Sequence, residues 1–212
     1  MLPDHIRAAI NDYCPRMTGF TTAQRCCDMA ELIIDNLPNM VVEIGVFGGR
    51  TMLAQAFALR EVGRGIIFGI DAYKFESCAE GERKENRDYW QNIDFGKLYL
   101  EAASTLFDHR LAPHAVLVQA RSQDVAYLFQ SIDILNIDGC HSEVASLRDV
   151  ELYLPRVRQG GYIWFDDIDW TDDAGKKTTV RAQEMIEQQC DVLRVEREAN
   201  STGYKLYRKR VG

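Results

Sequence analysis

Residues 40–62 read M-V-V-E-I-G-V-F-G-G-R-T-M-L-A-Q-A-F-A-L-R-E-V, and this stretch decides the fold. Its first part, 40–46, is short, apolar and rich in β-branched residues, which predicts a buried strand. The part from 50 to 62 has the apolar spacing of a helix. The glycines between the two parts allow a tight turn, so the strand runs directly into the helix, as at the start of a parallel α/β sheet.

The same alternation of strand and helix continues along the chain. Further strands are predicted at 65–71, 115–119, 132–138 and 161–165, and a terminal hairpin at 191–196 and 203–207 with its turn at 199–202. Helices are predicted at 96–109, 122–130, 143–157 and 176–189. Because the inner strands are almost continuously apolar, the predicted fold class is α/β: a seven-stranded, mostly parallel sheet with helices on both faces and a C-terminal antiparallel hairpin.

The domain organisation follows from the absence of repeats and linkers in the sequence. We expect one domain over 1–212, with a helical N-terminal preface at 1–38 and a polar insert at 73–94. The insert mixes aromatic and charged residues, so it is predicted to be a lid over a substrate. A solvated surface helix is the alternative.

Composition narrows the class of protein. The chain has 212 residues, 46% of them hydrophobic, and a formal net charge of −7. These are globular proportions, and the excess of acid disfavours a nucleic-acid or anionic-membrane partner, since both call for a basic face. The first residues lack the basic start and apolar core of a signal peptide, and the six cysteines show no C-x-x-C spacing. We therefore expect a cytoplasmic protein with reduced thiols.

Ligands of open parallel sheets bind at the carboxyl ends of the strands, so the residues there are the first candidates. The first strand ends in a G-x-x-G-G loop with Glu43 before it, and the second ends at Asp71. An acid at the second strand end is placed to accept hydrogen bonds from ribose hydroxyls, and Glu43 suits an ammonium group better than a phosphate. The loop and Asp71 together predict a nucleoside-containing cofactor, although a plain tight turn and a helix cap would also fit.

The fourth and fifth strands are followed by acids as well. Asp138 ends the fourth strand, and Asp166 and Asp167 end the fifth. Close carboxylates repel one another, so they predict a hard cation such as Mg²⁺, with a solvated acidic loop as the alternative. His141 follows Asp138 by three residues and is a candidate general base, or only a residue at the start of a helix.

Taken together, E-I-G-V-F-G-G-R-T, G-I-D, R-S-Q-D, I-D-G-C-H-S and W-F-D-D resemble a known family in order and spacing. They are similar to class I S-adenosylmethionine-dependent methyltransferases, which have a Rossmann-like sheet. Within that class the resemblance is to metal-dependent O-methyltransferases of the catechol type and of the macrolide or aminocoumarin sugar type. It covers about 41–170.

The resemblance implies a site that can be stated residue by residue. The residues implied to bind the cofactor are Glu43, Gly45, Phe47, Gly49, Thr51, Asp71, Ser122, Gln123 and Asp138. The implied ligands of Mg²⁺, or of another hard divalent cation, are Asp138, Asp166 and Asp167. His141 is implied to be the catalytic base, ahead of Asp138.

The function implied by the resemblance is methyl transfer from S-adenosylmethionine to a hydroxyl of a small polyhydroxylated, sugar-like or catechol-like acceptor. Two alternatives stay open. One is a nicotinamide-dependent oxidoreductase that uses the same loop, and the other is a cofactor-binding, cephalosporin-hydroxylase-like subunit without methyl transfer. The sequence does not identify the acceptor, and it leaves a homo-oligomer open.

Overall fold

The computed structural model describes residues 1–197 and 202–212, so the predicted hairpin turn at 199–202 lies largely outside the described residues. The chain divides into two compact units. The first consists of Met1–Tyr73 and Asp94–Gln119, and the second of Lys74–Ile93 and Ala120–Gly212.

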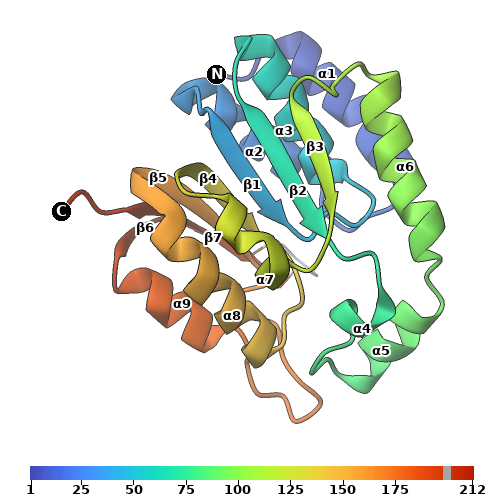
Figure 1. Cartoon of the computed structure of the whole chain (residues 1–212), viewed down its shortest axis with the longest axis vertical. Helices are drawn as coiled ribbons and strands as arrows, with labels where there is room; N and C mark the ends of the chain where they lie inside the picture. The colour runs from blue at the N-terminus through green and yellow to red at the C-terminus, as the bar shows by residue number, and fades with distance from the viewer. Residues whose placement is uncertain (198–201) are drawn as a thin grey trace. The chain divides into compact units, whose positions relative to one another are not determined.

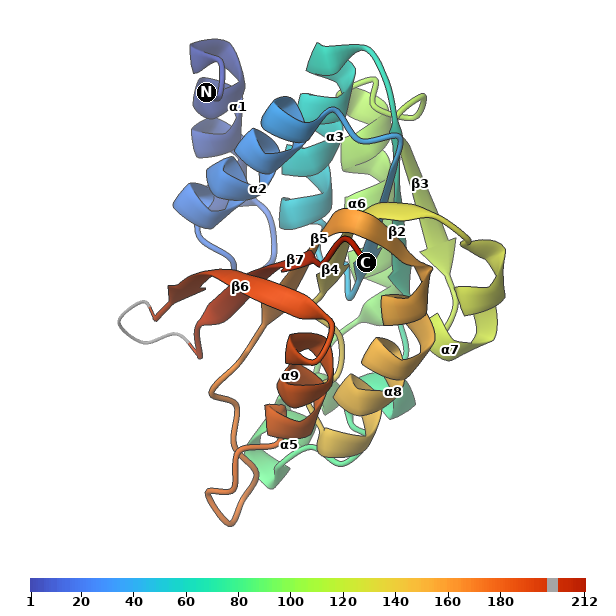
Figure 2. The ribbon, with the colours of Figure 1, turned by 90° about the vertical axis from the view of Figure 1, so that its left-hand side faces the viewer.

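The first unit contains three parallel strands, which lie side by side in Figure 1. The strands are β1 (Met40–Ile44), β2 (Ile66–Asp71) and β3 (Ala115–Gln119), in the order β3-β2-β1. The helices are α1 (Asp4–Tyr13), the 3-10 turn η1 (Cys14–Arg16), α2 (Ala23–Asn36), α3 (Arg50–Val62) and α6 (Phe95–Asp108). Figure 2 shows α1, α2 and α3 packed together.

Helix α3 is the centre of this unit. Every residue from Thr51 to Leu59 is buried, because α2 packs on one side of the helix and β2 on another. Gly49 begins the helix with φ 90° and Gly63 ends it with φ 69°, two left-handed backbone conformations that favour glycine. The helix therefore has the bounds that its apolar pattern predicts.

The second unit contains four strands, of which the last two are antiparallel to their neighbours. The strands are β4 (Ile132–Ile137), β5 (Val157–Asp166), β6 (Cys190–Glu196) and β7 (Tyr204–Lys209). The helices are α4 (Phe75–Cys78), α5 (Lys84–Gln91), α7 (Ser122–Val125), η2 (Ala126–Leu128), α8 (Glu143–Tyr153), η3 (Leu154–Arg156) and α9 (Val180–Glu187). Helices α8 and α9 pack against each other, as Figures 1 and 2 show.

The strand order is β3-β2-β1-β4-β5-β7-β6, with β1 to β5 parallel within each unit and β7 and β6 forming the antiparallel hairpin. The predicted Rossmann-like α/β fold class is confirmed. Among residues 1–197 and 202–212, none of the helices has both the length and the apolar content that crossing a membrane requires.

The last predicted helix begins four residues later than expected, at Val180 rather than Lys176. The residues before it are held by other bonds. Lys177 forms a bridge with Thr171, and the Thr178 N–H donates to the Trp170 carbonyl at 3.0 Å. The segment 171–178 therefore folds back on itself and on Trp170, which the helical spacing alone does not indicate.

Candidate active site

The glycine loop joins β1 to α3 by a tight turn within the first unit. Gly45 has φ 87° and its N–H donates to the Ile70 carbonyl at 2.9 Å. The Gly49 N–H donates to the Val46 carbonyl at 2.8 Å. Phe47 has φ 50° although it has a side chain, so the loop holds it in a conformation that L-residues rarely adopt.

Asp71 holds this loop. Its Oδ2 accepts hydrogen bonds from the backbone N–H groups of Val46 and Phe47, both at 3.0 Å, and its Oδ1 accepts one from Tyr73 at 2.8 Å. Burial raises the pKa of the Asp71 carboxyl group, and these three hydrogen bonds act in the opposite direction. The acid at the end of β2 thus fixes the turn at the end of β1, and its contact with a ribose stays a prediction.

Glu43 lies inside the first unit and not at its surface. It is 0% exposed, Oε1 accepts from Thr51 Oγ1 at 2.7 Å, and Oε2 accepts from Gln55 Nε2 at 2.6 Å. Thr51 and Gln55 lie one turn apart on α3, so they present two donors to the same carboxylate. Gln55 was missed from the sequence, and its i+4 spacing from Thr51 is the signal that could have found it. The predicted contact of Glu43 and Thr51 with a cofactor stays a prediction.

The preface contributes a segment over the glycine loop that the sequence did not indicate. Arg50 Nε donates to the Met17 carbonyl at 2.9 Å, and its Nη1 donates to the Thr21 carbonyl at 3.0 Å. A Cβ on Gly48 would lie 2.0 Å from the Thr18 carbonyl oxygen. The Phe20 and Phe47 rings stack at 5.5 Å. Glycine at position 48 is thus required by the close approach of another segment of backbone.

Ser122 and Gln123, predicted beside the cofactor, are both fixed by α8 in the second unit. Ser122 Oγ donates to Asp149 Oδ1 at 2.5 Å, and Gln123 Oε1 accepts from Arg148 Nη1 at 2.7 Å. Burial raises the pKa of Asp149 to about 6, while the Ser122 hydrogen bond and the Arg148 charge act in the opposite direction. The predicted contact of Ser122 and Gln123 with the cofactor stays a prediction. Asp149 and Arg148, which hold these two side chains by hydrogen bonds, were not singled out from the sequence.

Asp138, His141 and Asp167 come together in the second unit. One ligand atom from each lies within 4.8 Å of those of the other two, and His141 Nε2 lies 2.6 Å from Asp167 Oδ2. Asp138 follows β4 directly, and Asp167 follows β5. Asp167 has φ 55°, its carbonyl accepts from Thr179 Oγ1 at 3.0 Å, and Thr202 Oγ1 donates to its side chain.

Asp166 is outside this group. It is buried at the end of β5, and its Oδ1 accepts the Asp167 N–H at 2.9 Å. Among the described residues, the group that could hold a cation therefore has His141 in the place where three carboxylates were expected. Asp166 is the last residue of β5, whereas Asp167 follows the strand with φ 55°, so the alternation of side chains along the strand ends between them. The predicted role of Asp166 as a ligand stays a prediction.

The negative charges of Asp138 and Asp167 are balanced by a proton on the His141 imidazole. Burial by itself would lower the pKa of the imidazole. The charge and hydrogen bond of Asp167, together with the charges of Asp138 and Glu82, outweigh burial and raise this pKa to about 10. His141 is therefore an imidazolium at neutral pH when no other cation is near.

The donor set fits a divalent cation. Two carboxylate oxygens and one imidazole nitrogen are ligands of the kind that Mn²⁺ and other first-row metals accept, and the carboxylates also suit Mg²⁺. A bound cation would take over the balancing charge that the proton on His141 otherwise provides.

The insert reaches this group through Glu82, which the sequence did not single out. Glu82 is buried, Oε1 accepts the His141 N–H at 3.1 Å, and Oε2 accepts the Trp170 indole N–H at 3.2 Å. The rings of His141 and Trp170 lie 4.7 Å apart, and the Arg83 guanidinium lies 5.0 Å from the Trp170 ring.

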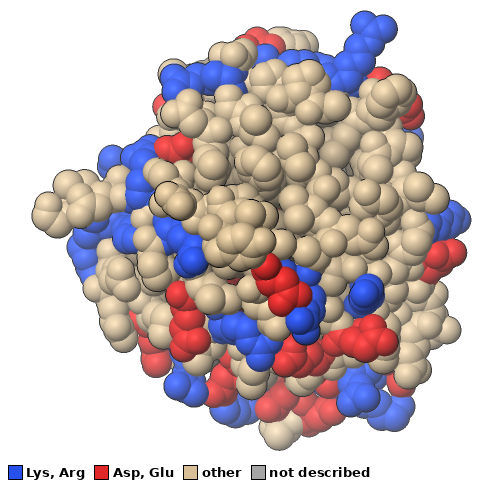
Figure 3. All heavy atoms as spheres, in the orientation of Figure 1, with Lys and Arg blue, Asp and Glu red and all other residues tan. Residues whose placement is uncertain are grey.

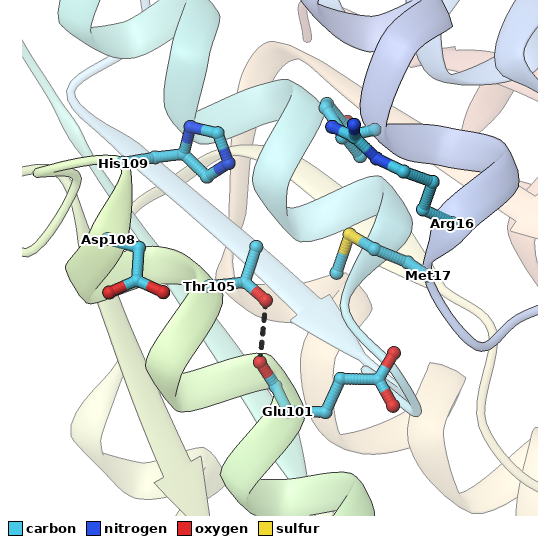
Figure 4. A pocket seen from close by; sticks show the side chains of 7 residues that line it. Arg16, Met17, Glu101, Thr105, Asp108 and His109 are labelled. Carbon is cyan, nitrogen blue, oxygen red and sulfur yellow. Dashed lines mark hydrogen bonds between the residues drawn. The ribbon is translucent and has the colours of Figure 1, made fainter.

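A hollow of about 300 Å³ in the first unit contains none of the predicted site residues. Its lining consists of Tyr13, Arg16, Met17, Glu101, Thr105, Asp108 and His109. Figure 4 shows the Thr105 hydroxyl donating to the Glu101 carbonyl, and the Glu101 carboxylate accepts from Thr18 N and Oγ1. These bonds join α6 to the preface.

Comparison with known families assigns the chain. The family model Methyltransf_24, described as a methyltransferase domain, matches residues 42–168. The chain belongs to this methyltransferase family. The match spans the glycine loop, Asp71, Asp138, His141 and both acids at the end of β5, so it favours the predicted methyltransferase over the nicotinamide-dependent oxidoreductase.

Solved structures similar to this methyltransferase agree in fold. The O-methyltransferase TomG from Streptomyces achromogenes, in complex with SAM, has 17% identity and a TM-score of 0.67, over 99% of this chain and 91% of TomG. The O-methyltransferase from Bacillus cereus, in complex with SAH, has 15% identity and a TM-score of 0.65, over 98% and 92%. SAH-bound PaMTH1 from Podospora anserina has 13% identity and a TM-score of 0.63, over 99% and 89%.

Proposed function

We propose that this methyltransferase transfers a methyl group from S-adenosylmethionine to a hydroxyl of a small polyhydroxylated acceptor, with the help of a divalent cation. The observation that carries the proposal is the Asp138–His141–Asp167 group in a chain of a methyltransferase family. Support for the cofactor comes from similar folds solved with SAM or SAH, and support for an oxygen acceptor from two of them that are O-methyltransferases.

The cofactor is proposed to bind at the glycine loop of the first unit. Asp71 holds the turn in one conformation before any ligand arrives, so little ordering free energy is lost on binding. The backbone around Phe47 and Gly49 leads into the N-terminus of α3, where unpaired N–H groups favour a carboxylate such as that of methionine.

The cation is proposed to be held by Asp138 and Asp167 with His141 beside them. When bound, it would lower the pKa of the acceptor hydroxyl and fix its orientation. His141 Nε2 is proposed to accept the hydroxyl proton, which requires that the imidazole has first lost the proton that balances the two carboxylates. The acceptor oxygen then forms a bond to the methyl carbon as the carbon–sulfur bond breaks, and S-adenosylhomocysteine leaves as a neutral thioether.

The insert is proposed to form one wall of the acceptor site. Trp170 lies against His141, and Arg83 of the insert lies on Trp170, so an acceptor near His141 would meet an aromatic surface. Such a surface excludes water from the reacting oxygen. A small, flat or ring-shaped polyol fits this arrangement better than a polymer does.

The test measures S-adenosylhomocysteine after incubation with S-adenosylmethionine and a panel of catechol, flavonoid and sugar acceptors. We expect product with Mg²⁺ or Mn²⁺ and a loss of at least about 100-fold with EDTA, because electrostatic stabilisation contributes on this scale. The variants Asp138→Asn and Asp167→Asn should lose activity and metal affinity in titration calorimetry.

Asp191→Asn on β6 is the matched control, because its ion pair with Arg210 is on the surface. Binding of S-adenosylmethionine without product for any acceptor would favour the cephalosporin-hydroxylase-like alternative. Product that EDTA leaves unchanged would remove the cation from the mechanism and keep the methyltransferase.

A further inference from the structure

Glu82 is the one insert residue whose side chain bonds to both His141 and Trp170 among the described residues. It lies between α4 and α5, 59 residues from His141 and 88 residues from Trp170. Three N–H groups donate to its two oxygens. These are the His141 N–H at 3.1 Å, the Trp170 indole N–H at 3.2 Å and Asn86 Nδ2 at 2.8 Å. The Cys140 thiol lies 3.6 Å from Glu82 Oε1 but closer, at 3.1 Å, to the Glu80 carbonyl.

The chemistry of these partners requires a carboxylate. All three are donors that meet both oxygens, and only a carboxylate offers two acceptor oxygens and no hydrogen. A glutamine at this position would turn an NH₂ group toward at least one of these donors, which leaves that donor without an acceptor. The arrangement of these donors therefore indicates that position 82 requires a carboxylate.

The insert packs closely against the rest of the second unit at Gly81. Gly81 has φ 67°, and a Cβ there would lie 2.8 Å from Ser142 Cβ, at the residue that caps α8. On the other side of His141, the Thr178 hydroxyl donates to the His141 carbonyl at 2.6 Å. The backbone of His141 is thus held from both sides, by Glu82 at its N–H and by Thr178 at its carbonyl.

We propose that Glu82 is a positioning residue of the active site, which fixes the backbone of His141 and the indole of Trp170 so that the Asp138–His141–Asp167 group can bind a divalent cation. This inference rests on the proposed function. Glu82 itself is not a ligand in the proposal, because its two oxygens are already bonded to the donors named above. It acts through His141 and Trp170.

The experiment compares Glu82→Gln with Glu85→Gln in the full chain. Both changes remove one negative charge from the insert, but Glu85 is exposed on α5. Glu82 holds His141, and His141 lies 2.6 Å from the proposed ligand Asp167, so it orients that carboxylate from outside the coordination shell. We therefore expect Glu82→Gln to weaken Mn²⁺ binding by about 10-fold and Glu85→Gln to leave it unchanged. The affinity for S-adenosylmethionine, which is proposed to bind at the glycine loop, should stay the same in both variants.

A second readout reports the geometry without any metal. The chain has three tryptophans, so ¹⁵N-labelled protein gives three indole N–H signals. Trp170→Phe identifies the Trp170 signal by its disappearance. We expect this signal to move upfield in Glu82→Gln, because its charged acceptor is lost, and to stay in place in Glu85→Gln.

The outcomes separate the inference from the proposed function. An indole signal and a Mn²⁺ affinity that both stay unchanged in Glu82→Gln would overturn the positioning role. If the unmodified protein binds no Mn²⁺, the cation proposal fails, and the indole signal alone decides whether Glu82 positions Trp170. If Glu82→Gln does not fold, Trp170→Phe replaces it. That variant should weaken Mn²⁺ binding with unchanged S-adenosylmethionine affinity, and equal Mn²⁺ affinity would contradict the proposal.

Discussion

At the scale of single residues, Asp149 carries a carboxyl group that is buried beneath Ser122. Its pKa is raised from 3.8 to about 6, so the folded protein binds more protons at this group than the unfolded chain does between these values. The stability that Asp149 contributes is therefore fully present below pH 3.8 and is lost as the pH rises through about 6. The shift corresponds to about 3 kcal/mol.

This predicts the behaviour of Asp149→Asn, which cannot ionise. The unmodified protein should lose stability from pH 4.5 to pH 7.5, and the variant should not. The free energy of unfolding of the variant, minus that of the unmodified protein, should therefore rise by about 1–3 kcal/mol between these two pH values. Urea unfolding at the two pH values measures the difference. Glu151→Gln, an exposed change on the same helix, is the control and should show no such pH dependence. An equal difference between Asp149→Asn and the unmodified protein at both pH values would contradict the raised pKa.

The Asp71 side chain holds the glycine loop and is also predicted to contact a ribose, and a substitution can distinguish these two roles. Asp71→Asn should destabilise the protein by about 1–3 kcal/mol, because an amide cannot accept all three backbone hydrogen bonds. Calorimetry with S-adenosylmethionine and with an analogue that lacks the ribose hydroxyls distinguishes the roles. If Asp71 also binds the ribose, the substitution should weaken binding of the intact cofactor more than binding of the analogue. If the affinities for the intact cofactor and for the analogue fall equally, Asp71 holds the loop and does not bind the ribose.

Residue types and strand ends were enough to predict that Asp138 and His141 lie near the end of β5, but not the surroundings of the predicted site residues. The sequence placed Asp138 and His141 three residues apart, and the structure brings both to Asp167. It could not show that Asp71 accepts from the loop, because the left-handed conformation of Phe47 has no signal in the residue type. It also could not show Glu82, whose partners lie 59 and 88 residues away.

At the scale of elements, the glycine loop and the preface make contact at Gly48. Gly48→Ala places a Cβ against the Thr18 carbonyl, so either the loop or the 17–21 segment must move. We expect a loss of stability of at least about 2 kcal/mol and weaker S-adenosylmethionine binding. Thermal unfolding and calorimetry measure these changes.

The control for Gly48→Ala is Gly63→Ala at the end of α3. A Cβ on Gly63 meets nothing within 4 Å, but φ is 69°. It should cost only the backbone strain, about 1 kcal/mol, and leave cofactor binding unchanged. Equal effects of the two variants would show that the close approach of the preface is unimportant.

The elements themselves were predicted best where one periodic pattern is buried. Helix α3 has the predicted bounds because its apolar residues face a core and nothing competes with them. Strand β3 also has the predicted bounds, which follow from its pairing with β2, since only Ala115 of this strand is buried. Helix α9 begins late because 171–178 makes tertiary bonds to Trp170 and His141 instead. Such bonds depend on chain segments that the local sequence does not contain.

At the scale of the whole molecule, charge is the property that bears on partners. The net charge is −7. On the face shown in Figure 3, acidic and basic side chains alternate in the lower part, and several basic side chains gather at the left edge. Nucleic acids bind through their phosphates to extended basic surfaces, which a net acidic chain disfavours. The absence of a nucleic-acid partner therefore stays our prediction for this chain.

Fluorescence anisotropy with labelled single-stranded and duplex RNA tests this expectation. At physiological salt we expect no binding up to about 10 μM, a concentration within the usual range of non-specific Kd values, about 1–100 μM. Addition of S-adenosylmethionine should not change the result. Saturable binding below that concentration would contradict a small-molecule acceptor and favour a nucleic-acid substrate. Sedimentation of the same samples would show whether the chain forms a homo-oligomer.

The left-handed backbone of Asp167 has a consequence for laboratory evolution. A glycine there would relieve the strain of φ 55°, but it would also remove the carboxylate that pairs with His141 at 2.6 Å and accepts from Thr202 Oγ1. Losing one partner of a buried ion pair costs about 3–5 kcal/mol, more than the roughly 1–3 kcal/mol that such backbone strain stores. A library selected for survival at high temperature alone should therefore retain aspartate at this position, as should a library selected for turnover. The strained backbone at position 167 is thus kept by the contacts of its side chain.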